Sequence, residues 1–102
     1  MDISVLRSKA DSAAGFLKQL ANPNRLAILC ELLRGERSVG ELEAVVGLSQ
    51  SALSQHLAKL RAAKLVATRR ESQTIYYALA DPGVSKIIGA LYELYCGPAR
   101  RR

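Results

Sequence analysis

The most reactive side chains in this chain are two cysteines and one histidine. Cys30 and Cys96 lie far apart in the sequence, and neither belongs to a CxxC or CxC motif. In a reducing compartment such a pair is seldom a structural disulfide, so it is either an ordinary pair of core residues or a redox site. Core packing is the alternative, since free cysteine is among the most buried residue types and Cys30 continues the apolar stripe of Leu26 and Leu33. Spacing alone favours core packing and leaves a sensor role open.

The single histidine, His56, suggests neither a metal site nor a catalytic centre. One imidazole cannot hold zinc by itself, and the sequence contains no paired carboxylates and no Gly-rich phosphate loop. We therefore expect no enzyme, no catalytic residues, no metal ligands and no cofactor. His56 lies at the edge of the apolar seam of a predicted helix, so we expect a phosphate or base contact or a support for that helix.

Basic residues concentrate in the middle of the chain, where a polyanion would bind. The net charge is +6, and no acidic residue occurs between Ser49 and Arg70. Residues 49–79 contain only Glu71 against the basic side chains Lys59, Arg61, Lys64, Arg69 and Arg70. This pattern favours nucleic acid as a partner, and a solvated basic surface without a partner is the alternative.

Residues 49–61 predict a helix that reads DNA. Leu53, Leu57 and Leu60 fall on one side at helical spacing, and the other side presents short neutral polar side chains followed by a lysine. Gln and Ser can donate to and accept from base edges in the major groove, whereas Lys and Arg contact phosphates. The structural alternative is a plain amphipathic helix. The predicted DNA-binding residues are Gln50, Ser51, Ser54, Gln55, His56, Lys59, Arg69 and Arg70.

The elements that must position these residues follow from periodicity and from end signals. Helical spacing predicts helices over about 4–20, 23–34, 41–46, 49–63 and 82–96. Their start signals include Asn22-Pro23, a capping box of Ser38 and Glu41, and Ser49. Two β-prone runs, 65–70 and 74–79, predict a hairpin. The fold class is therefore mainly α with a small β-hairpin, a winged helix-turn-helix of four helices, two strands and a last helix.

Length and composition narrow the class of protein. With 102 residues, 49% of them hydrophobic and 24% charged, the chain predicts a single globular domain spanning residues 1–102. It contains no run of about 18 apolar residues, and its start lacks a basic segment followed by an apolar stretch. We therefore expect no membrane association, no secretion and a cytoplasmic location.

Residues 20–79 resemble the ArsR/SmtB family of winged-helix repressors. The matching segments are 20–29, 39–42, 48–57 and, in the hairpin, 65–66, 69–70 and 76–77. The resemblance implies a homodimeric repressor, paired through its terminal helices, that binds double-stranded DNA at an inverted-repeat operator and releases it when an inducer binds. Lys64 and Ser72 stand where the family commonly has glycine, a difference that bears on the angle of the hairpin.

The same resemblance suggests what the protein senses. Metal sensors of the family commonly carry a cysteine pair on the third helix, or His and acidic ligands on the last one. Here residues 38–46 contain no cysteine and residues 84–96 contain no histidine. The placement of Cys30 and Cys96 is similar to that in the persulfide- and redox-responsive subgroup, where reactive sulfur species or oxidants bridge two cysteines and lower DNA affinity. The resemblance thus implies that Cys30 and Cys96 form a redox sensor.

Three other interpretations stay open at this point. The protein could sense a metal ion through a non-standard site, or it could be a DNA-binding regulator without cysteine sensing. A winged helix can also serve protein contacts alone, without binding DNA.

Overall fold

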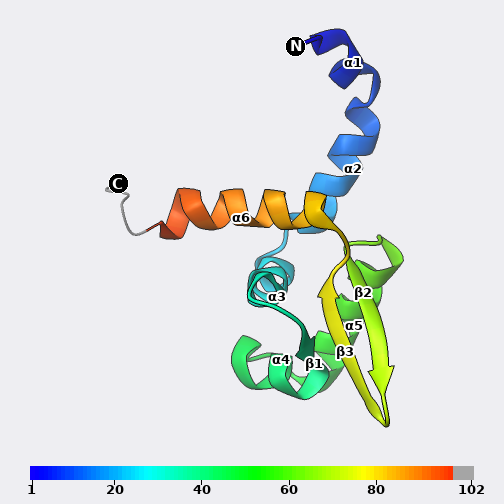
Figure 1. Ribbon diagram of the computed structural model, residues 1–102, viewed down its shortest axis with the longest axis vertical. Coiled ribbons are helices and arrows are strands. Elements are labelled where there is room, and N and C mark those ends of the chain that lie inside the picture. The colour runs from blue at the N-terminus through cyan, green and yellow to red at the C-terminus, as the bar shows by residue number, and fades with distance from the viewer. Residues whose placement is uncertain (98–102) are drawn as a thin grey trace.

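The computed structural model describes residues 1–97, and residues 98–102 of the predicted domain lie outside the described part. It confirms the predicted fold class, a mainly helical structure with a small antiparallel sheet (Figure 1). The elements in chain order are α1 (Ile3–Ser8), α2 (Ala10–Leu20), α3 (Pro23–Leu33), β1 (Arg37–Ser38), α4 (Val39–Val46), α5 (Gln50–Ala62), β2 (Val66–Glu71), β3 (Thr74–Leu79) and α6 (Pro82–Cys96).

The predicted start signals of α3, α4, α5 and α6 are confirmed, because at each a side chain caps free backbone N–H groups. Asn22 accepts from the backbone N–H groups of the first turn of α3, and Asp81 does the same for α6. At α4 the Ser38 hydroxyl accepts from the N–H of Glu41 at 3.1 Å, and the Glu41 carboxylate accepts from the N–H of Ser38 at 2.8 Å.

Three features of the fold differ from the prediction. The expected helix over 4–20 is divided at Lys9 into α1 and α2. The Ser8 hydroxyl donates to the carbonyl of Val5, which competes with helix continuation, and α1 buries no side chain within the described chain. The strand β1 was not predicted, because two residues are too short to show an alternating pattern. In addition, α4 begins at Val39, directly after its cap, rather than at Glu41.

The hydrophobic core lies where α3, α5 and α6 meet the sheet. In α3 the buried residues are Ile28, Leu29 and Leu32. The rest of the core comprises Leu20, Leu42, Leu53, Leu57, Leu60, Leu65, Val66, Val84 and Ile88.

The sheet has the strand order β1-β3-β2, and both pairings are antiparallel. In its register Tyr76 lies opposite Ser38 on one side and Arg69 on the other. Lys64 and Ser72, the two positions where the family commonly has glycine, adopt positive φ angles of 63° and 56°. The backbone therefore keeps a conformation that favours glycine, and the side chains of Lys64 and Ser72 make that conformation sterically strained. We call the β2–β3 hairpin, with its Ser72-Gln73 turn, the wing.

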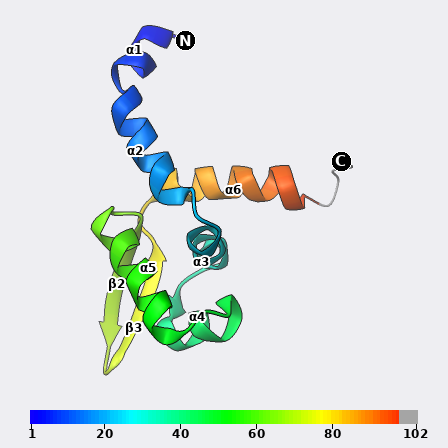
Figure 2. The same ribbon diagram turned by 180° about the vertical axis from the view of Figure 1, so that it is seen from behind.

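The terminal helices and the helix-turn-helix lie at opposite ends of the molecule (Figures 1 and 2). Figures 1 and 2 show α1 and α2 projecting at one end, with α6 crossing beside α2, and α4, α5 and the wing at the other. Within residues 1–97, no helix is both long enough and apolar enough to cross a membrane.

Candidate nucleic-acid interface

The helix α5 buries one face and exposes the other, as predicted. Leu53, Leu57 and Leu60 are 0%, 1% and 0% exposed. Each such leucine contributes roughly 1.5–3 kcal/mol by leaving water, so the rotation of α5 about its axis is fixed by this seam. The opposite face consists of exposed residues, namely Gln50, Ser51, Ser54, Gln55, Ala58 and Lys59.

A short turn joins α4 to α5 and sets the start of the exposed face. Gly47 ends α4 with a left-handed φ of 79°, and the Ser49 hydroxyl accepts from the N–H of Ala52 at 3.2 Å. Two helices joined in this way form the predicted helix-turn-helix, and Gln50 and Ser51 lie at the exposed N-terminal turn of its second helix.

His56 links α5 to α3 through a side-chain hydrogen bond. The side chain is partly buried, and its Nδ1 accepts a hydrogen bond from Nε of Arg25 at 3.4 Å. Arg25 belongs to α3 and also donates to the Gln19 side-chain oxygen at 2.8 Å. His56 therefore connects α5 to α3, which agrees with the supporting role among the roles predicted for it.

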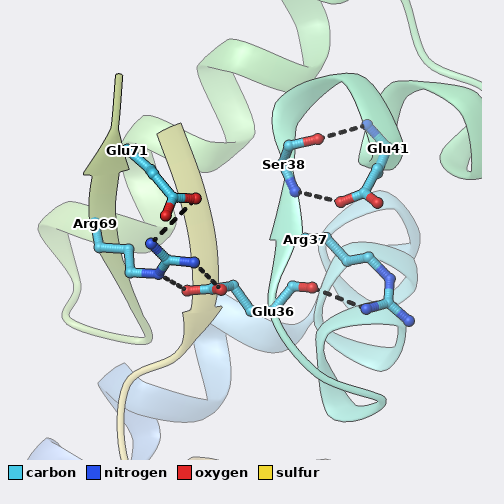
Figure 3. A network of polar contacts seen from close by, with 6 residues as sticks. All are labelled: Glu36, Arg37, Ser38, Glu41, Arg69 and Glu71. Carbon is cyan, nitrogen blue, oxygen red and sulfur yellow. Dashed lines mark hydrogen bonds and ion pairs between the residues drawn. The ribbon is translucent and has the colours of Figure 1, made fainter. Parts of the chain in front are cut away.

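The two wing arginines have different surroundings. Arg69 donates to both carboxylate oxygens of Glu36, with Nε to Oε2 at 2.6 Å and Nη2 to Oε1 at 2.8 Å (Figure 3). Its guanidinium also lies over the Tyr76 ring, 4.6 Å from the ring centre. Arg70 is exposed and has no ion-pair partner among residues 1–97.

The sequence did not predict that Glu36 pairs with Arg69 in the candidate interface. It lies 33 positions before Arg69, in the connection between α3 and β1, so no local pattern linked the two. The hydrogen bonds and positive charge of Arg69 lower the pKa of Glu36, and Glu36 in turn raises the pKa of Arg69. The wing is therefore less cationic than its own sequence indicates.

The two cysteines lie on elements that pack against each other. Cys30 is on α3, Cys96 is the last residue of α6, and both are exposed free thiols. Core packing of Cys30, which spacing alone favoured, is therefore wrong. Tyr92, one turn before Cys96, lines a common cavity with Cys30 and Arg34. Partial burial raises the pKa of Cys30, and the negative charge of a neighbouring Cys96 thiolate raises it further.

Among the described residues, no group of three or more His, Cys, Asp or Glu side chains could hold a metal ion.

An open apolar groove lies between α2, α3 and α6, lined by Leu17, Leu20, Ala21, Leu26, Ile87, Ala90, Leu91 and Leu94.

Comparison with known proteins agrees with this geometry. Residues 22–68 match the family model described as bacterial regulatory protein, arsR family. The chain is 59% identical over 86 residues to the nodulation protein NolR of Rhizobium meliloti, which covers 84% of this chain and 70% of NolR. It is 49% identical over 96 residues to the transcriptional activator HlyU of Vibrio cholerae, covering 94% of this chain and 89% of HlyU.

Solved structures agree in sequence and in fold. The structure of reduced HlyU from Vibrio cholerae superposes with a TM-score of 0.84 at 50% identity, covering 89% of this chain and 96% of HlyU. The transcriptional repressor BigR from Xylella fastidiosa gives a TM-score of 0.87 at 40% identity, covering 94% and 98% of the two chains. HlyU is named a transcriptional activator and BigR a transcriptional repressor, which points to a DNA-binding regulator rather than an enzyme. The chain therefore belongs to the ArsR family of bacterial regulatory proteins, whose helix-turn-helix binds DNA.

Proposed function

We propose that this regulator is a homodimeric repressor that leaves its operator when Cys30 and Cys96 are bridged. The observation that carries the proposal is the placement of the two thiols, exposed on the neighbouring helices α3 and α6. A thiolate pair needs both solvent access and proximity to react with a sulfur oxidant, and this placement is compatible with both.

The DNA-binding part of the proposal rests on the exposed face of α5. Gln50, Ser51, Ser54 and Gln55 carry amides and hydroxyls that can hydrogen-bond to base edges, and they occupy the N-terminal part of the helix, which normally enters the major groove. Lys59 follows on the same side and is assigned to a phosphate. Among the wing arginines, Arg70 is exposed, and Arg69 is bound to Glu36.

The homodimer part rests on the opposite end of the molecule. The groove between α2, α3 and α6 has an almost entirely apolar lining, and α1 and α6 also expose large apolar side chains, including Ile3, Val5, Leu6, Tyr92 and Tyr95. Exposed apolar surface on this scale marks a protein interface. We assign it to a second copy, which would place two α5 helices against the two halves of an inverted repeat, with centres about 34 Å apart.

The switching reaction balances with an organic polysulfide or disulfide as the oxidant. One cysteine thiolate attacks a sulfur atom of the reagent and expels a thiolate. The second cysteine then attacks the mixed species, and a further thiolate leaves. The two thiols lose two electrons and two protons, the reagent is reduced to thiols, and the product bridge contains two or more sulfur atoms. Such a bridge ties α3 to α6 and alters the spacing of the two α5 helices.

The test measures release from a labelled duplex that contains the promoter region of the gene itself. We expect the reduced protein, Cys30→Ser and Cys96→Ser to bind alike, and polysulfide to release the parent protein only. Mass spectrometry of the intact parent should show a bridge and count its sulfur atoms. Release that persists in both serine variants contradicts cysteine sensing, and release by zinc or copper ions instead supports a non-standard metal site.

A further inference from the structure

The Glu36–Arg69 ion pair joins the wing to the start of the helix-turn-helix. Glu36 directly precedes β1, and the second residue of β1, Ser38, caps α4. Figure 3 shows the carboxylate of Glu36 between Arg69 of β2 and the segment that leads to this cap. A two-point contact at 2.6 and 2.8 Å therefore spans the junction between β2 and the segment leading to α4.

Arg69 is already paired with acidic side chains, and two of its five N–H donors are bound to Glu36. Nε and Nη2 donate to Glu36, Nη1 lies 3.8 Å from the Glu71 carboxylate, and one face of the guanidinium covers the Tyr76 ring. Two carboxylates surround this single cation, so the local charge is not positive. A DNA phosphate would have to compete with Glu36 for Nε and Nη2, or approach Nη1 beside the Glu71 carboxylate.

Arg70 lies on the other face of the sheet, because successive residues of a strand alternate between faces. It shares its face with Val66, which is buried in the core, and with Thr68, which pairs with Tyr77. Tyr77 lines a shallow groove together with Ser54 and Ala58 of α5. Arg70 therefore projects from the face of the wing that adjoins the exposed surface of α5.

We infer that Glu36 and Arg69 are positioning residues that fix the wing relative to α4 and α5, and that Arg70 alone is the phosphate contact of the wing. The inference rests on the proposed DNA binding and revises its assignment of the two wing arginines. It also makes Glu36, an acidic residue near a DNA-binding surface, favourable for binding rather than repulsive.

A charge exchange tests the positioning role without changing the net charge. In the double variant Glu36→Arg with Arg69→Glu, the ion pair can form again in the opposite sense. We expect its affinity for the promoter duplex to lie within about fivefold of the parent, the range that an exposed ion pair spans. Arg69→Glu alone should bind far more weakly, because it places three carboxylates together beside the duplex.

The outcomes separate the two roles. If Arg69 itself contacted a phosphate, the exchanged variant would bind as weakly as Arg69→Glu, and that result overturns the inference. Thermal melting of every variant shows that each is folded. Glu36→Asp adds a further arm, because a shorter carboxylate retains the charge but not the two-point geometry, and it should loosen amide exchange protection in the wing.

Arg70 provides an independent measurement. Arg70→Gln should reduce the slope of log affinity against log salt concentration by about 0.9 per protomer. Arg69→Gln paired with Glu36→Gln should leave that slope unchanged. An unchanged slope in Arg70→Gln overturns the inference. Absence of binding by the parent at low salt would instead defeat the proposed function, so the two failures are distinguishable.

Discussion

Replacing Lys59 and Gln55 separately by alanine should resolve the two kinds of DNA contact on α5. The residues lie one turn apart on the same exposed face, and Lys59 has no ion-pair partner among residues 1–97. In the proposed homodimer, Lys59→Ala would remove one phosphate contact per protomer, hence two per dimer. The slope of log affinity against log salt concentration should therefore become less steep by about 1.8.

The size of this effect makes it measurable by fluorescence anisotropy. Over a fourfold rise in salt concentration, the loss of affinity should be about twelvefold smaller in Lys59→Ala than in the parent. Gln55→Ala should keep the parental slope, because it removes no charge. It should instead reduce the preference for the operator over an unrelated duplex, by about 1–3 kcal/mol for each two-point base contact that is lost.

Lys9→Ala is the matched control for charge. Lys9 is exposed between α1 and α2, at the end of the molecule opposite α5 (Figure 1). It changes the net charge by the same amount as Lys59→Ala, yet it should leave the salt slope unaltered. If Lys9→Ala and Lys59→Ala had equal slopes, the effect would be one of net charge. If Gln55→Ala weakened binding to both duplexes equally, Gln55 would not read bases.

Three further predictions concern the thiol, the turn and the interface. In Cys96→Ser, the rate at which iodoacetamide alkylates Cys30, measured by mass spectrometry, should rise with pH because only the thiolate reacts. The midpoint of this rise should lie above that of an ordinary thiol, because partial burial raises the pKa of Cys30. A midpoint at or below the ordinary value contradicts this. Lys64→Gly should raise the free energy of unfolding by about 1 kcal/mol or less, since φ is 63° there, whereas Ala63→Gly, at a φ of −81°, should lower it. Leu17→Glu, in the apolar groove, should shift sedimentation toward the monomer, while Val45→Glu, equally exposed on α4, should not; equal behaviour of the two variants removes the groove from the interface.

The capping residues of α3, α4, α5 and α6 were predictable because their interactions are local. Ser38 and Glu41, and likewise Ser49 and Ala52, interact within three residues of each other. The buried seam of α5 was predictable for a related reason, since its other face is polar and leaves only one way to orient the helix. These features depend on neither the sheet nor the packing of distant helices.

The exposure of Cys30 was not predictable, because α3 carries apolar side chains on more than one side. The stripe of Leu26, Cys30 and Leu33 fits helical spacing, but the buried residues are Ile28, Leu29 and Leu32. Which stripe faces the core depends on the placement of α6 and the sheet, which the sequence of α3 does not contain. The Glu36–Arg69 pair was hidden for the same kind of reason, because it exists only through the strand order β1-β3-β2.

The position of α3 gives the proposed bond between Cys30 and Cys96 a route to the proposed DNA-binding surface of α5. Arg25 joins α3 to His56 of α5, and Cys30 lies five residues further along α3, about 7.5 Å along the helix axis. Because a helix of this length is stiff, a bridge from Cys30 to α6 that tilts α3 also moves its contact with α5. A coupling of about 1–3 kcal/mol then changes DNA affinity five- to 150-fold. A shift too small to disturb the core is sufficient, because both α5 helices of a dimer must fit successive major grooves at once.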